Sequence, residues 1–118
     1  MAEAALCTLW GSPVPGREKQ ALNVYNEAMQ YWAGLEQEGK IERFDVTVLA
    51  FSGGDLTGLL VVRGTAKQID SVRRSKEFQQ YIAHGQLVAS HLNVARAYVD
   101  EGLAQFMGWY QKVIDLAV

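Results

Sequence analysis

The sequence has little cysteine, little proline and no excess of charge of either sign. Its 118 residues include one cysteine, two prolines, 11 Lys and Arg and 13 Asp and Glu. Because Cys7 has no second cysteine to pair with, and because the N-terminal segment carries an acid where a signal peptide needs basic residues, we expect a cytoplasmic protein. Lys and Arg form no basic run, which argues against a nucleic-acid partner. No apolar stretch approaches the roughly 18 residues of a membrane span, so no membrane partner is expected.

What is present is the composition of one globular domain. Hydrophobic residues make up 49% of the chain and charged residues 20%, which is typical of folded proteins rather than of disordered ones. The length favours a single domain over residues 1–118. A chain of this size buries enough apolar surface to fold without disulfides or structural metals.

Hydrophobic periodicity predicts four strands and three helical regions. The alternation of apolar and polar residues predicts strands at 4–10, 41–51, 59–63 and 92–99. The 3.6-residue period predicts helices at 17–38, 66–84 and 101–117. Thr65, Ser75 and Asp100 are the expected N-caps and Gly39 a left-handed stop. Ser75 and Gly85 are expected to break the second helical region into two or three pieces.

The order of these elements predicts an α+β fold. Residues 4–99 read β-α-β-β-α-β, the ferredoxin-like sandwich, followed by an additional C-terminal helix at 101–117. Right-handed crossovers place both main helices on one face of an antiparallel sheet. The other face is expected to carry Leu6, Trp10, Leu49, Phe51, Leu59, Val61, Leu92, Val94 and Tyr98. Because so large an apolar patch is costly in water, we expect a homodimer in which two sheets stack through this exposed face, with C-terminal helices able to reach across.

Three segments carry a resemblance to a known group of proteins. They are residues 14–18 (VPGRE) at the start of the first helix, Arg63-Gly64 at the end of the hairpin, and residues 74–79 (RSKEFQ) in the second helical region. Together they resemble the dimeric α/β-barrel superfamily, and within it antibiotic-biosynthesis-monooxygenase-type domains and their uncharacterised relatives. The resemblance covers roughly residues 4–99. It implies pairing as a dimeric α/β barrel but no single function, because the superfamily includes cofactor-independent monooxygenases, haem-degrading enzymes, isomerases and stress proteins.

His84 is the candidate catalytic residue, because histidine is the side chain that exchanges protons near neutral pH. In haem-degrading relatives a histidine on this helix binds iron, supported by an asparagine on the first strand and by a tryptophan. The first strand here offers Thr8 and Trp10 but no asparagine, so the supporting set is incomplete and we expect no haem. His84 and His91 would lie roughly 10 Å apart on a helix, too far to share a zinc ion, so we expect no metal or other cofactor. The alternative is that His84 is simply a helix-end residue that meets carbonyls or solvent.

Aromatic residues define the candidate ligand site. In monooxygenase-type relatives the pocket lies between the helices and the sheet and is lined by aromatic rings. The resemblance therefore implies that Tyr25, Trp32, Phe78, Tyr81 and His84 form the wall of a pocket for a small hydrophobic or aromatic ligand. The alternative is that the same stripe of rings is solid core.

Arg63 is a further candidate ligand-binding residue. Arg43, Asp45, Arg63 and Arg96 share the mixed parity of their strands and would meet on one face of the sheet. A guanidinium there binds a planar carboxylate or enolate through paired hydrogen bonds. We favour the alternative, an ion-pair network with Asp45 in the dimer interface.

Two functions follow from these residues. The first is a dimeric small-molecule-binding or assembly module without catalysis. The alternative is a cofactor-independent monooxygenase or isomerase that acts on an aromatic or polyketide-like molecule, with His84 moving protons. The sequence contains no complete catalytic set, so the module ranks first.

Overall fold

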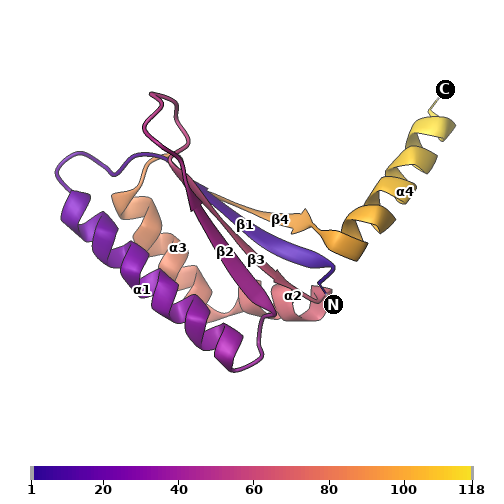
Figure 1. The fold of residues 1–118 in the computed structure, drawn as a ribbon, viewed down its shortest axis with the longest axis horizontal. Helices are drawn as coiled ribbons and strands as arrows, with labels where there is room; N and C mark the ends of the chain where they lie inside the picture. The colour runs from indigo at the N-terminus through magenta and orange to yellow at the C-terminus, as the bar shows by residue number, and fades with distance from the viewer. Residues whose placement is uncertain (1, 118) are drawn as a thin grey trace.

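The computed structural model describes residues 2–117, which form four strands and four helices (Figure 1). The strands are β1 (Ala4–Trp10), β2 (Arg43–Val48), β3 (Gly58–Gly64) and β4 (Asn93–Tyr98). The helices are α1 (Glu18–Gln37), α2 (Ala66–Arg74), α3 (Lys76–Val88) and α4 (Asp100–Leu116). The predicted strands and helices are therefore all present, with ends that differ by a few residues.

The four strands form one antiparallel sheet in the order β2-β3-β1-β4. The connections β1-α1-β2 and β3-α2-α3-β4 each skip one strand, which is the ferredoxin-like arrangement. Helices α1 and α3 lie on the same side of the sheet (Figure 1). The predicted fold class is confirmed.

The core lies between this side of the sheet and the helices. On α1 the predicted stripe faces inward: Trp32 and Leu35 are buried, and Ala28 packs against them. The sheet contributes Leu6 and Val62, both fully buried. The remaining buried members of the core are Ala4, Ile41, Leu60, Ile69, Val72 and Phe78. A continuous apolar cluster of this kind is the main source of the stability of the fold.

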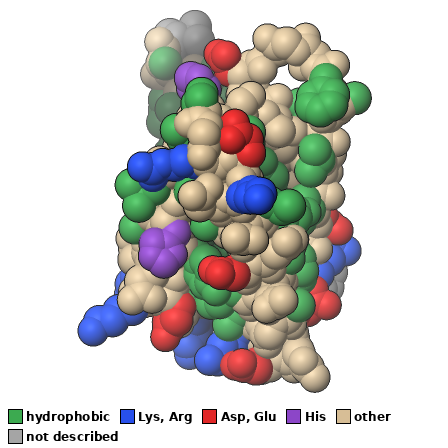
Figure 2. All heavy atoms as spheres, turned by 90° about the vertical axis from the view of Figure 1, so that its left-hand side faces the viewer, with side chains coloured by type: hydrophobic (Ala, Val, Ile, Leu, Met, Phe, Trp, Pro, Cys, Tyr) green, Lys and Arg blue, Asp and Glu red, His purple; other side chains and the backbone are tan. Residues whose placement is uncertain are grey.

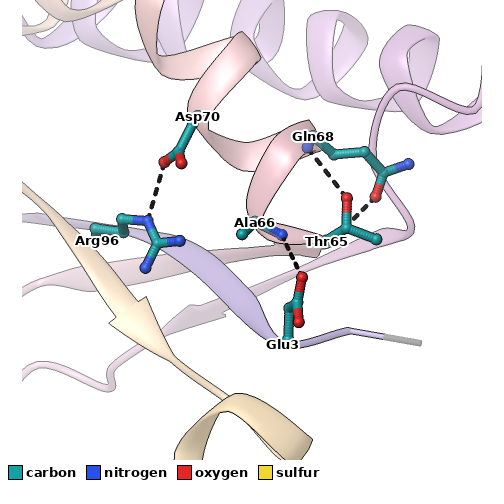
Figure 3. Close-up of polar contacts among 6 residues, drawn as sticks. All are labelled: Glu3, Thr65, Ala66, Gln68, Asp70 and Arg96. Atoms are coloured by element: carbon teal, nitrogen blue, oxygen red, sulfur yellow. Dashed lines mark hydrogen bonds and ion pairs between the residues drawn. The ribbon is translucent and has the colours of Figure 1, made fainter. Parts of the chain in front are cut away.

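Local side-chain chemistry fixes the helix ends as the sequence predicts. The Thr65 hydroxyl accepts from the Gln68 amide at 3.1 Å, and the Gln68 side chain accepts from the Thr65 amide at 2.8 Å (Figure 3). Glu3 adds a carboxylate oxygen that accepts from the Ala66 amide at 2.9 Å. Ser75 caps α3 through the Phe78 amide, and Gly39 has a φ of 74° after α1. These contacts satisfy backbone groups that a helix leaves unpaired.

Replacement of Thr65 tests this cap. We expect Thr65→Ala to lower the free energy of unfolding by about 1 kcal/mol, because the Gln68 amide loses its partner at a part-buried helix start. Ser71→Ala, at an exposed position of the same helix, is the control and should leave stability unchanged or slightly higher. Urea unfolding followed by circular dichroism measures both, and equal stability of the two variants would contradict the role of the cap.

Two predicted features of the helices are wrong. Gly85 does not interrupt the second helical region, because α3 continues through it to Val88. Gly85 is buried, and a Cβ there would meet Leu92 at 3.0 Å, so its small size serves packing. Asp100 does not cap α4: it is the first helical residue with a φ of 50°, and Val99 occupies the N-cap position without a side-chain bond.

The assignment of residues to the two faces of the sheet is also corrected. Leu6, Trp10 and Val94 face the helices rather than the open side. Tyr98 shares their side, because its cross-strand partner is Ala4, and Leu92 lies before β4 begins at Asn93. Strand β2 ends at Val48, so Leu49 and Phe51 belong to the loop that follows and not to the sheet. By alternation from Leu6 and Leu60, the open face carries Cys7, Leu9, Leu59 and Val61, all half-buried. We refer to these four side chains as the open face.

Helix α4 stands apart from the rest of the molecule. It leaves the end of β4 and points away from α1 and α3 (Figure 1). Its only substantial contacts with another element within residues 2–117 are with β4. None of the helices in this part of the chain is long and apolar enough to cross a membrane.

Candidate functional site

A cavity of about 280 Å³ lies between the sheet and helices α1 and α3. The sheet contributes Thr8, Trp10 and Leu60 to its wall, and the rest of the wall comes from the two helices and the loops at one end of the sheet. The lining residues from α1 are Glu18, Ala21, Leu22, Val24, Tyr25, Ala28, Met29 and Trp32. Those from α3 and the segment after it are Phe78, Tyr81, Ile82, Gly85, Val88, Ala89 and Leu92. The cavity therefore lies within the core that joins the two layers.

Aromatic rings form much of the wall. Trp10 and Tyr25 have ring centroids 6.3 Å apart, and Trp32 lies edge-on to Phe78 at 5.9 Å. Behind them Tyr31 contacts both Trp32 at 4.9 Å and Tyr81 at 4.7 Å. Such tilted and edge-to-face contacts are the favoured geometry of aromatic pairs. These contacts between rings restrict the movement of the aromatic side chains that line the cavity.

Two segments that border the cavity at one end are held together by hydrogen bonds. The Gly11 amide donates to the Ser90 carbonyl at 2.7 Å, and the Val14 amide donates to the Val88 carbonyl at 2.8 Å. The Arg17 guanidinium donates to the Leu87 carbonyl at 3.1 Å. The loop between β1 and α1 is thereby fixed to the end of α3. Gly11 and Pro13 of this loop and Val88 and Ala89 at the end of α3 all line the cavity.

Glycine at position 58 makes room for the indole of Trp10. A Cβ at Gly58 would lie 2.5 Å from the Trp10 ring, a distance that real carbon atoms do not adopt. Gly58 and Trp10 face each other across the β1–β3 pair. The missing side chain therefore decides where Trp10 lies in the cavity wall.

The wall carries almost no charge. Within residues 2–117, Glu18 is the single charged residue of the wall, and its carboxylate accepts from the Gly16 amide at 3.2 Å at the exposed start of α1. No Lys, Arg or His is among the lining residues. The wall offers no positive charge to an anionic molecule, so the free-energy cost of removing the anion from water would remain uncompensated. The chemistry of the wall suits a neutral, mainly apolar molecule.

The predicted site residues divide into two groups. Tyr25, Trp32, Phe78 and Tyr81 all line the cavity. His84 is exposed on α3 and lies outside the lining. Figure 2 shows the histidine side chains at the surface of the side where α1 lies. The structure therefore brings the aromatic candidates together and leaves the proposed proton carrier outside their cavity.

Arg63 belongs to a different place. It lies on the open side of β3, where its guanidinium donates to Asp45 at 2.8 Å. Arg43 is its cross-strand neighbour, and the Nε atom of Arg63 is buried with no partner among the described residues. Arg96 was expected in this cluster but lies on the helix side, where it pairs with Asp70 of α2 at 3.0 Å (Figure 3). The reason is that Arg96 is the cross-strand partner of Leu6, and directly opposed residues of neighbouring strands point to the same side of the sheet.

In the described part of the chain, burial raises the pKa values of two side chains, Tyr31 and Cys7. Desolvation is the main cause that raises the pKa of Tyr31 above its usual value, and the hydrogen bond with Ser75 acts in the opposite direction. Tyr31 is thus a neutral phenol that supports Tyr81 and Trp32. Burial also raises the pKa of the Cys7 thiol on the open face, which lowers its reactivity.

Sequence reasoning missed the contribution of the sheet to the wall. Thr8 and Trp10 line the cavity, and Thr8 is 8% exposed. Thr8 and Trp10 lie two and four residues after Leu6, so the sequence already indicated that all three point to the same side of the strand. However, both faces of β1 carry apolar residues, and the pattern alone did not say which face meets the helices.

No group of three His, Cys, Asp or Glu side chains within residues 2–117 is arranged to hold a metal ion.

Comparison with known proteins identifies the fold. No protein-family model and no curated protein matches the sequence. A dimeric protein of unknown function and ferredoxin-like fold from Bacteroides fragilis is similar in structure, with 9% identity and a TM-score of 0.59 over 81% of this chain and 96% of that one. An ethyl tert-butyl ether d (ethd) family protein from Bacillus halodurans has 15% identity and a TM-score of 0.58 over 85% and 100%. SnoaB, a cofactor-independent oxygenase from Streptomyces nogalater, has 10% identity and a TM-score of 0.56 over 86% and 96%.

These similarities show a ferredoxin-like α+β fold. The resemblance inferred from the sequence is thereby confirmed for the fold, and the structural neighbours include both a dimeric protein and a cofactor-independent oxygenase. One fold of this kind carries many functions, so function has to be argued from the cavity and the surfaces of this chain.

Proposed function

We propose that the protein is a homodimer that binds a small, neutral, hydrophobic or aromatic molecule in the cavity between α1, α3 and the sheet. The observation that carries this proposal is the cavity itself. In a fully packed core, the side chains of Tyr25, Trp32, Phe78 and Tyr81 would fill the space between the helices and the sheet. Here they line a cavity of about 280 Å³.

The size and lining of the cavity set the class of ligand. A volume of about 280 Å³ is close to the lower end of the roughly 300–1,000 Å³ of ligand pockets. One or two fused rings fit such a space. Polar groups in the wall are few, and Glu18 would repel an anion. Affinity would therefore come from apolar contact with the rings and from burial of the ligand surface.

The open face supports the homodimer. Cys7, Leu9, Leu59 and Val61 are covered by none of α1, α2 and α3, which pack on the other side of the sheet. A half-buried apolar face on two central strands is stabilised when a second copy covers it. A structural neighbour with this fold is described as dimeric. The Arg63–Asp45 pair at the border of the open face supplies polar groups for the rim of such an interface.

Filling the cavity tests ligand binding. We expect wild-type protein to bind the neutral fluorescent probe N-phenyl-1-naphthylamine, with energy transfer from Trp10 and Trp32 in the wall. Ala28→Phe places a ring in the cavity from α1 and should weaken probe binding at least tenfold. Fluorescence titration measures both affinities, and thermal unfolding shows whether the variant remains folded.

Ala33→Phe is the matched control. Ala33 lies on the same helix, is exposed, and is outside the cavity lining, so this variant should bind the probe like the wild type. The anionic analogue 1-anilinonaphthalene-8-sulfonate should bind more weakly than the neutral probe. Equal affinity of the Ala28→Phe and wild-type proteins would contradict the site.

The second candidate function is a cofactor-independent oxygenase or isomerase. Its support is the structural similarity to SnoaB together with an apolar cavity, which would orient an aromatic substrate and exclude water. In this function His84 is the proposed proton carrier, although it lies outside the cavity lining. An aromatic compound that binds the cavity separates the two functions. An oxygenase consumes oxygen with it and an isomerase changes its NMR spectrum, whereas the binding module holds the compound without turnover.

A further inference from the structure

Helix α4, which we call the arm, carries most of the uncovered apolar side chains of the described chain. Seven large hydrophobic residues are exposed along it: Leu103, Met107, Trp109, Tyr110, Val113, Ile114 and Leu116. Leu103, Met107, Tyr110 and Ile114 follow the spacing of one helix face. The opposite side carries polar residues such as Gln111, Lys112 and Asp115. An amphipathic helix of this kind needs an apolar surface to cover it.

The base of the arm is firmly seated, so its direction is built into the fold. Gly102 is buried against the backbone of Glu3 so closely that a Cβ would lie 2.7 Å from the Glu3 carbonyl carbon. Phe106 stacks on Tyr98 of β4 at 4.3 Å. These contacts hold the first two turns of α4 at the end of the sheet. The following turns project away from the other helices (Figure 1).

A second uncovered apolar group lies at the opposite end of the sheet. Val48, Leu49 and Phe51 are 60%, 38% and 109% exposed, and we call them the hairpin patch. Val48 pairs with Gly58 at the loop end of β2 and β3. The arm begins after Tyr98, which pairs with Ala4 at the other end. A rigidly based arm that points away cannot cover the hairpin patch of its own chain.

We propose that the arm packs against the hairpin patch of a second copy of this chain. This inference rests on the proposed homodimer and extends it. Suppose that two open faces stack about a two-fold axis that runs between the sheets, perpendicular to the strands. The end of each sheet where the arm begins, at Tyr98, then lies over the end of the other sheet where Val48 leads into the hairpin loop. Each arm then meets the hairpin patch of the partner, and the same contact forms twice.

The dimensions fit this arrangement. Seventeen residues of α-helix are about 25 Å long, whereas stacked sheets lie about 10 Å apart. The arm is therefore long enough to cross this gap at the loop end of the partner sheet, so that its outer turns reach the partner's hairpin patch.

The exposed area and the charge also favour a second copy. The exposed portions of the seven arm side chains come to on the order of 700 Å², close to the roughly 800 Å² that each partner buries in a standard interface. The polar side of the arm has three acids, Asp100, Glu101 and Asp115, and one base, Lys112. Such a charge balance disfavours an anionic lipid surface. A copy of the chain supplies the complementary apolar patch.

Cross-linking between differently tagged copies tests the contact. In a Cys7→Ala background, one copy carries Phe51→Cys and the other Ile114→Cys, and the mixture is treated with the short cross-linker bismaleimidoethane. Both positions are exposed outside the core, so the variants are expected to fold. Mixed adducts should exceed adducts between two Ile114→Cys copies at least fivefold. A copy with Lys112→Cys, on the polar side of the arm, should give at least fivefold fewer mixed adducts.

Three results would overturn the inference: absence of mixed adducts, a majority of adducts between two Ile114→Cys copies, or equal yields with Lys112→Cys. Sedimentation separates this failure from failure of the proposed homodimer. A dimer that forms without mixed adducts removes the arm contact and leaves the stacked sheets. A monomer removes both, while binding of the neutral probe in the cavity is measured independently.

Discussion

Gly102→Ala is expected to displace the arm and to lower the free energy of unfolding by about 2 kcal/mol. A Cβ at this position would lie 2.7 Å from the carbonyl carbon of Glu3 and closer still to its oxygen. Both atoms belong to the backbone, which cannot rotate away as a side chain would. Overpacking of this kind costs roughly 1–3 kcal/mol. The strain would also reach the Glu3 carboxylate that accepts from the first amide of α2.

Gly108→Ala is the matched control on the same helix. A Cβ at Gly108 meets nothing within 4 Å, so the substitution should raise stability by up to about 1 kcal/mol through the better helix propensity of alanine. The two glycine variants should therefore move the urea midpoint in opposite directions. If both stabilise the protein, the close contact between Gly102 and Glu3 is not part of the folded state.

Leu59→Asp is expected to convert the dimer to monomers. Leu59 lies on the open face opposite Leu9 and Thr47, and it is half-buried in one chain, so the carboxylate is hydrated in the monomer. In stacked sheets the two-fold axis places two such carboxylates in an apolar interface without partners. Burial of unpaired charge costs several kcal/mol. A rise of at least 100-fold in the dissociation constant, about 2.7 kcal/mol, is expected.

Sedimentation equilibrium measures this change, from twice the 13.1 kDa chain mass to the mass of one chain. Leu87→Asp is the control, because Leu87 is 60% exposed on α3 on the other side of the molecule and should leave the dimer intact. Alkylation of Cys7 gives an independent reading, since this thiol is on the open face and should react faster once the partner leaves. An unchanged dimer in the Leu59→Asp protein would show that the interface lies elsewhere.

The elements and their caps could be predicted because their signals are local. The stripe on α1 repeats at helical spacing, so Trp32 and Leu35 had to share a face with Tyr25 and Ala28. Thr65 and Ser75 act on amides only three residues away. Four of the predicted ligand-site residues line one cavity because they belong to the inner faces of α1 and α3.

The exposed position of His84 could be predicted from the helical spacing of α3. Phe78, Ile82 and Gly85 lie on the inner face of α3 and line the cavity. Each residue advances about 100° around a helix, so His84 lies on the flank of that face. Its exposure follows from this spacing. The ability of histidine to exchange protons does not by itself show that His84 reaches the cavity.

Local sequence is enough to specify the strands, the helices and the inner side of each amphipathic helix, because these depend on neighbours within a few residues. Which face of β1 meets the helices depends instead on packing between distant segments. Leu6 and Thr8 on one parity and Cys7 and Leu9 on the other are both compatible with burial, and the packing of α1 and α3 selects between them. The tertiary structure also decided that α4 projects, because the close seat of Gly102 on Glu3 joins residues from opposite ends of the chain.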